Sequence, residues 1–228
     1  MRTSPVLALA AGLAMSVGSA QALPDPAWPD LRPELHDYRC EDRPDNELPD
    51  DDPRPEPTTE AERARYAMRA RYREYFPAYL ARVAPEPAAE LIMPVDGVSL
   101  GQIADTYGAP RWDRSHEGLD IFAPRGTPVR AAAPGFVYRI EDLSLGGLSV
   151  TVFGAGGVRY FYTHFESVPG ELTEGQRVET GDLIGFVGNS GNAAGTPPHL
   201  HFGVYHGENG DLCEWRAVNP LPILRDRP

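Results

Sequence analysis

The chain has 228 residues and a formal net charge of -12 at pH 7, and this length suits one well-packed domain with additional segments. The strong negative charge argues against a nucleic-acid partner and against adhesion to an anionic membrane. All 21 of the Lys and Arg residues are arginine, and the absence of lysine excludes a Schiff-base lysine, a Ser-Lys dyad and a biotinyl or lipoyl attachment site. The sequence does not indicate an oligomeric state.

Residues 1–22 have the pattern of a secretory signal peptide. Arg2 provides a short positive region, residues 6–17 form an apolar run, and Ala20-Gln21-Ala22 offers small residues for cleavage. The apolar run is too short for a membrane span, and the alternative interpretation is a buried N-terminal helix. We expect the mature protein to begin near Leu23 and to be exported, either periplasmic or secreted, without a membrane span.

The two cysteines, Cys40 and Cys213, are expected to form one disulfide bond. An exported chain lies where disulfides persist, and an even number of cysteines permits one bridge. The alternative is two unrelated thiols. A bridge would connect the N-terminal part of the chain to a position close to the C-terminus.

Two segments with different expected conformations follow the signal peptide. Residues 23–57 are rich in Pro, Asp and Glu with few aliphatic residues, and this composition predicts an extended or loosely ordered segment. Residues 58–84 are predicted to form an amphipathic helical segment, because Thr59-Glu60-Ala61-Glu62 fits a capping box and apolar side chains recur behind it at helical spacing. Pro77 predicts a kink or two short helices. The apolar stripe indicates packing, with ligand binding as the alternative.

Residues 91–228 have the pattern of a mainly β domain. Short apolar runs alternate with turns that contain Gly and Pro, which is typical of an antiparallel sheet. The stretches that begin at Gly126 and Gly175 are faintly similar to each other and to the hybrid-barrel hairpins of biotinyl and lipoyl carriers. We therefore predict an antiparallel sheet with hybrid-barrel-like hairpins that form a groove. The expected strands are residues 119–122, 136–140, 149–153, 158–164, 183–187 and 200–205.

Four of the six histidines lie in three short stretches that carry chemistry. His199 and His201 are two residues apart on a predicted strand and therefore share a face, a pairing that is rare among core histidines. Asp120 follows His116 by four residues and alternates with core positions on its strand. His164 by itself is typical of a satisfied polar residue in a strand. Three imidazole or carboxylate ligands would leave a fourth zinc position open for water, as in hydrolytic zinc sites.

The three stretches together resemble the lysostaphin/LytM-type zinc metallopeptidases, also called β-lytic-type endopeptidases. The family pattern is H-x(3)-D, then Y-x-H, then H-x-H, and this sequence supplies His116/Asp120, Tyr162-Thr163-His164 and His199-Leu200-His201 in that order. The resemblance covers roughly residues 93–224. It implies that His116, Asp120 and His201 hold Zn2+, and that His164 and His199 are the catalytic pair, with His199 preferred as the general base.

Four positions refine this resemblance. Glu117 follows His116 and superficially matches the zincin motif H-E-x-x-H, but a β run after Gly118 argues against the helix that this motif needs. Tyr107 and Tyr162 are candidates to line the groove. Gly203 stands where many relatives have a charged or polar residue, which leaves the chemistry intact but can change the shape of the groove.

The resemblance implies a zinc-dependent endopeptidase that hydrolyses peptide bonds in peptidoglycan stem peptides or cross-bridges. The alternative is a non-catalytic activator of other cell-wall hydrolases, because some relatives have lost zinc ligands. Here all five positions are filled, which favours the enzyme. A third interpretation is a protease that attacks a foreign cell wall or a protein, and the sequence does not separate it from remodelling of the cell's own wall.

Overall fold

The structure of the protein is a computed structural model that describes residues 80, 84, 86–111, 114–208 and 211–228. The predicted signal peptide, the acidic segment and nearly all of the predicted helical segment lie outside these residues. Cys40 and the side chain of Cys213 also lie outside them. The disulfide bond, the signal peptide and the boundaries of these segments therefore stay predictions. No helix within the described part of the chain is long and apolar enough to cross a membrane.

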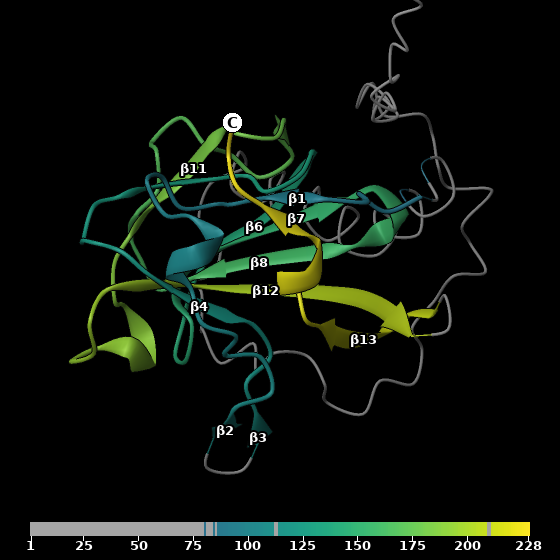
Figure 1. The fold of residues 1–228 in the computed structure, drawn as a ribbon. Helices are drawn as coiled ribbons and strands as arrows, with labels where there is room; N and C mark the ends of the chain where they lie inside the picture. Colours follow the sequence, from purple (N-terminus) through teal and green to yellow (C-terminus); the bar gives the residue numbers. More distant parts are fainter. Residues whose placement is uncertain (1–79, 81–83, 85, 112–113, 209–210) are drawn as a thin grey trace, which may run out of the picture.

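A seven-stranded antiparallel sheet forms the centre of the fold (Figure 1). Its strand order is β10-β6-β7-β8-β12-β13, and β4 pairs with the start of β12. The prediction of a mainly β, antiparallel domain is therefore confirmed. The strands of this sheet are β4 (Leu119–Phe122), β6 (Gly135–Leu143), β7 (Gly147–Gly154), β8 (Arg159–Thr163), β10 (Arg177–Val178), β12 (His199–Glu208) and β13 (Asp211–Val218).

Smaller elements flank the main sheet. A three-stranded antiparallel sheet contains β5 (Pro128–Arg130), β11 (Leu183–Val187) and β9 (Phe165–Ser167). The short strands β2 (Pro110–Arg111) and β3 (Arg114–Ser115) pair with each other. Single-turn 3-10 helices are η1 (Leu100–Gln102), η2 (Ala155–Gly157), η3 (Gly191–Ala193) and η4 (Leu221–Ile223).

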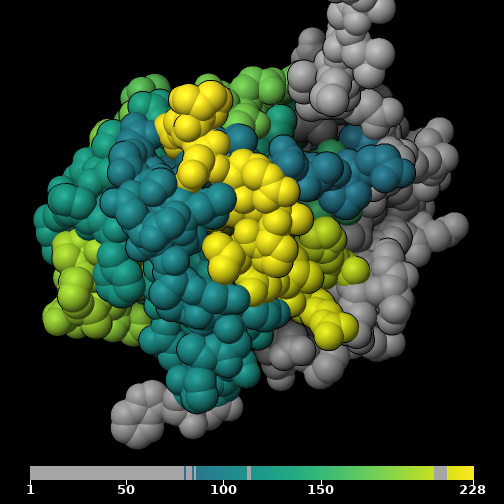
Figure 2. All heavy atoms as spheres, in the orientation of Figure 1, coloured from purple at the N-terminus to yellow at the C-terminus, as the bar shows by residue number. Residues whose placement is uncertain are grey.

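The C-terminal segment closes one side of the domain. Strand β14 (Leu224–Arg225) pairs in parallel with β1 (Leu91–Ile92). The side chain of Arg225 adds an ion pair with Glu90 at 2.9 Å. In the space-filling view the yellow C-terminal segment accordingly lies against the blue segment at the start of the domain (Figure 2).

The hydrophobic core lies on one face of β4 and β12, and this arrangement exposes the opposite face for chemistry. Leu119 and Ile121 on β4 are fully buried, as are the alternate apolar residues of β12. Because successive side chains on a strand point to opposite faces, Asp120 and the two histidines of β12 lie on the other side. Tyr162 belongs to the core and does not line the groove, since it is fully buried and its hydroxyl accepts a hydrogen bond from the Ala132 amide at 3.0 Å.

Candidate metal centre

The pairing of β12 with β4 and β8 brings the three predicted stretches together. His201 lies directly opposite Asp120 on β4 and opposite Thr163 at the end of β8. His116 precedes β4 by three residues, and His164 follows β8 directly. The antiparallel register therefore places residues from distant parts of the sequence on one face of the sheet.

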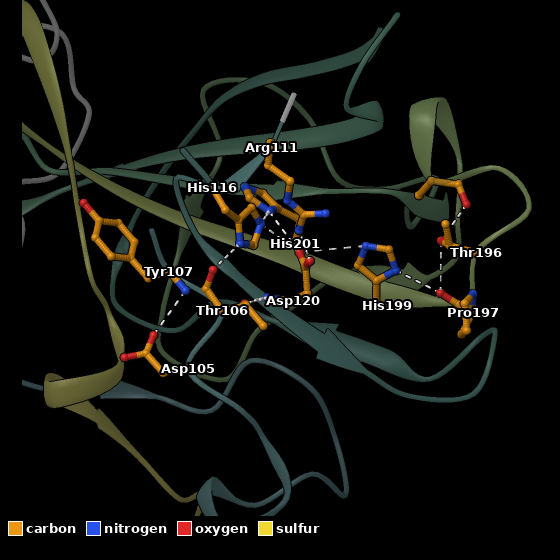
Figure 3. A network of polar contacts seen from close by, with 11 residues as sticks. Asp105, Thr106, Tyr107, Arg111, His116, Asp120, Thr196, Pro197, His199 and His201 are labelled. Atoms are coloured by element: carbon orange, nitrogen blue, oxygen red, sulfur yellow. Dashed lines mark hydrogen bonds and ion pairs between the residues drawn. The ribbon is translucent and has the colours of Figure 1, made fainter. Parts of the chain in front are cut away.

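His116, Asp120 and His201 converge closely enough to hold a metal ion (Figure 3). The Nε2 atom of His116 lies 2.8 Å from Nδ1 of His201. The Oδ1 atom of Asp120 lies 3.0 Å from the first of these nitrogens and 3.2 Å from the second. Two imidazole nitrogens and one carboxylate oxygen that face a common point fit a three-ligand metal site.

Thr106 and Arg111 orient these side chains from outside the cluster. The backbone carbonyl of Thr106 accepts a hydrogen bond from Nδ1 of His116 at 2.7 Å, and its hydroxyl accepts one from the Asp120 amide at 2.9 Å. A carbonyl can only accept, so Nδ1 of His116 carries the proton and the lone pair of Nε2 faces the cluster. Arg111 donates to Oδ2 of Asp120 at 2.6 Å, which leaves Oδ1 toward the histidines.

His164 and His199 flank the cluster, and each is held by a backbone carbonyl. Nδ1 of His164 lies 2.9 Å from the Ser190 carbonyl, and Nδ1 of His199 lies 2.9 Å from that of Pro197. A neutral ring held in this way has its proton on Nδ1 and keeps Nε2 as an acceptor. The two ring centroids are 5.0 Å apart, and both side chains are buried.

His164 adopts a backbone conformation that is uncommon for its residue type. Its φ of 66° lies in the left-handed region, and it is the only non-glycine residue with a positive φ among the described residues. Such strain clusters at functional sites. Here it turns the chain after β8 so that the ring faces the histidines of β12.

Burial and neighbouring charges favour an anionic Asp120 beside neutral imidazoles. Burial raises the pKa of the Asp120 carboxyl, but hydrogen bonds from His116 and His201 outweigh this effect, so its pKa is far below its usual value. Burial lowers the pKa of His164 to about 4 and also lowers the pKa of His201. A neutral imidazole has the lone pair that metal binding or proton transfer requires.

Tyr107 and Glu117 lie at a pocket of about 400 Å³ next to His116. The hydroxyl of Tyr107 donates to the Ala217 carbonyl at 2.8 Å. Glu117 is hydrogen-bonded to Tyr205 on β12 and is not one of the three converging groups. Strand β4 begins just after Glu117 and Gly118, at the position where the zincin motif H-E-x-x-H requires a helix. The complete lining is Tyr107, Gly108, Ser115, His116, Glu117, Trp215, Arg216 and Ala217.

Sequence reasoning identified the five central residues but missed the groups that orient them. Thr106, Arg111 and the Ser190 carbonyl act through contacts across the fold, and no local pattern marks them. Gly118 was noted only for its effect on helix formation. In the structure a Cβ at Gly118 would lie 2.7 Å from Cε1 of His201, so the glycine makes room for this ring.

Comparison with known proteins identifies the family of the domain. The sequence model of peptidase family M23 matches residues 114–220. An L-Ala--D-Glu endopeptidase from Bacillus subtilis is 37% identical over 117 residues, which are 49% of this chain and 35% of the relative. The DD-carboxypeptidase/endopeptidase Mpg from Neisseria meningitidis serogroup B is 40% identical over 115 residues, which are 50% of this chain and 24% of the relative. The chain thus spans about a third or less of these curated relatives.

One solved structure illustrates the similarity. The catalytic domain of lysostaphin from Staphylococcus simulans is 27% identical, and the matched region covers 54% of this chain and 92% of that chain at a TM-score of 0.45. The fold and the cluster define a domain of the metallopeptidase type. Residues 114–220 thus form a peptidase family M23 domain, and the predicted resemblance to lysostaphin/LytM-type peptidases is confirmed.

Proposed function

We propose that this protein is an exported, zinc-dependent endopeptidase that hydrolyses peptide bonds in the stem peptides or cross-bridges of peptidoglycan. The observation that carries this proposal is the convergence of His116, Asp120 and His201 with two further histidines beside them. The names of similar proteins support it, because they include an L-Ala--D-Glu endopeptidase and a glycyl-glycine endopeptidase from Staphylococcus capitis. The complete set of residues speaks against a non-catalytic activator.

In this proposal His116, Asp120 and His201 hold zinc. Imidazole and carboxylate ligands are typical of zinc, and three protein ligands are typical of its hydrolytic sites. When bound, zinc polarises the scissile carbonyl and lowers the pKa of water toward about 7. The contacts of Thr106 and Arg111 fix the orientation of two ligands, as outer groups do at zinc sites.

His199 is proposed as the general base, with His164 as its partner. Nε2 of His199 lies 3.9 Å from Oδ1 of Asp120, so the free acceptor of this ring faces the metal cluster. It can accept the proton of the attacking water and then donate it to the leaving amine nitrogen. His164 faces the histidines of β12, and its Nε2 can accept a hydrogen bond from the water and so orient it for attack.

The proposed organisation of the chain follows the sequence. Residues 1–22 would direct export, and residues 91–228 would form the catalytic domain. The periplasm or the outside of the cell is the proposed location, because a peptidoglycan substrate lies there.

Digestion of purified peptidoglycan tests this function. The mature protein should release peptides with new amino termini, which mass spectrometry of the fragments would identify together with the bond that is cut. It should contain one zinc ion per molecule, and His201→Ala should lose it because one of three ligands is gone. New reducing sugar ends without new amino groups would contradict a peptidase.

A further inference from the structure

Arg111 places a partly exposed guanidinium beside the proposed zinc ligands. Its side chain is 47% exposed, and its Nη2 atom lies 2.6 Å from Oδ2 of Asp120 (Figure 3). Among the described residues, Asp120 is the only polar partner of this guanidinium. A guanidinium has five N–H donors, so most of its donors are left for another molecule.

The position of Arg111 limits which part of a substrate it can reach. One carboxylate separates its guanidinium from the cluster, because the other oxygen of Asp120 faces His116 and His201. An extended peptide advances by about 3.5 Å per residue. A substrate group held by Arg111 would therefore belong to a residue next to the scissile bond.

Guanidinium groups prefer carboxylates, which they bind through two parallel N–H···O bonds. We infer that Arg111 is a specificity-determining residue that binds a free carboxylate of the substrate next to the scissile bond, while it keeps its contact with Asp120. This inference rests on the proposed function and deepens it. The substrate class would be peptides with an unmodified carboxylate, which peptidoglycan stem peptides contain.

The overall charge of the chain supports a local role for this cation. The protein has a net charge of -12, so it repels an acidic substrate as a whole. Arg125 is another exposed arginine of the domain, but its guanidinium is already paired with Glu166 and Asn189. A cation with free donors beside the cluster offsets this repulsion at the place where the substrate must bind.

The test compares soluble peptidoglycan fragments whose carboxylates are free with the same fragments after conversion of the carboxylates into amides. For each, kcat/KM is measured from the release of amino groups by the zinc-loaded protein. We expect the wild type to prefer free carboxylates about tenfold, the lower end for a charge-assisted hydrogen bond. Arg111→Gln should cleave both fragments at similar rates, and Arg111→Lys should keep part of the preference because it keeps the charge.

Arg114→Gln is the matched control, because Arg114 is exposed on the facing strand of the same hairpin. It should keep the full preference. Zinc affinity, measured by competition with a chelator, separates specificity from ligand positioning. Because Arg111 also orients Asp120, we expect zinc affinity to fall in Arg111→Gln by about 10–100-fold, the range for a disturbed outer contact, so both fragments are compared at saturating zinc.

Three outcomes would overturn the inference. Equal cleavage of both fragments by the wild type would overturn this inference and leave the proposed function standing. An Arg111→Gln variant that keeps the preference at saturating zinc, whatever its overall activity, would show that Arg111 only positions Asp120. A wild type that releases amino groups from neither fragment would overturn the proposed function, and this inference with it.

Discussion

Gly118 should be required for full metal affinity although it contributes no ligand. A Cβ at this position would lie 2.7 Å from Cε1 and 2.8 Å from Nε2 of His201, and 2.7 Å from the carbonyl oxygen of Phe202. Ordinary contacts begin near 3.4 Å, so in Gly118→Ala these atoms must retreat by about 0.7 Å. The Phe202 backbone is held in register with Leu119, so the backbone at residue 118 must shift away from it and the ring of His201 must move as well.

The size of this movement sets the expected loss. Metal–ligand distances are defined to within about 0.2 Å, so a ring displaced by several tenths of an ångström no longer fits the site. We expect zinc affinity to fall by about 10–100-fold, the range for changes that disturb ligand orientation. Overpacking should also destabilise the zinc-free protein by about 1–3 kcal/mol.

Competition with a chelator measures zinc affinity, and urea unfolding of the zinc-free protein shows whether the variant is folded. Gly101→Ala is the matched control, because a Cβ at Gly101 meets nothing within 4 Å and the residue is exposed. It should bind zinc like the wild type. A folded Gly118→Ala protein with unchanged zinc affinity would refute the packing argument.

Three further predictions concern the histidine pair, acid stability and the cysteines. His199→Ala and His164→Asn should each keep zinc but lose about 10²–10⁴-fold in turnover, and asparagine tolerates the positive φ of residue 164. Glu117→Gln should keep zinc and most activity because its carboxylate bonds to Tyr205, so an inactive, zinc-loaded Glu117→Gln beside an active His199→Ala would assign the base to Glu117. In the zinc-free protein, buried His164 has a pKa of about 4. In the unfolded chain His164 binds a proton below a pH of about 6.5. As the pH falls from about 6.5 to 4, the free energy of unfolding of the wild type should therefore decrease by at most about 3 kcal/mol relative to that of His164→Asn. Parallel pH profiles for the two proteins would contradict this. Cys40 and Cys213 should be disulfide-bonded in the exported protein, with a stabilisation of about 5 kcal/mol at most, and two free thiols in unreduced, unfolded protein would disprove the bond.

Local pattern was sufficient to predict several strands and the residues on their two faces. The predicted strand at 119–122 coincides with β4, and the one at 183–187 coincides with β11. Alternation depends only on residues two apart, so Leu119 and Ile121 could be assigned to the core and Asp120 to the opposite face. Strand β13 was not predicted, because charged residues interrupt its apolar residues and its stability comes from pairing with β12.

Motif spacing likewise singled out His116, Asp120, His164, His199 and His201, which the structure brings together. Only the tertiary structure showed the carbonyl of Thr106 behind His116, the guanidinium of Arg111 on Asp120, and the space that Gly118 leaves for His201. These contacts join residues that lie from 9 positions apart (Arg111 and Asp120) to 83 positions apart (Gly118 and His201, 201 − 118) in the sequence. Strand register and loop conformation determine such contacts, and neither can be predicted from a short stretch of the sequence.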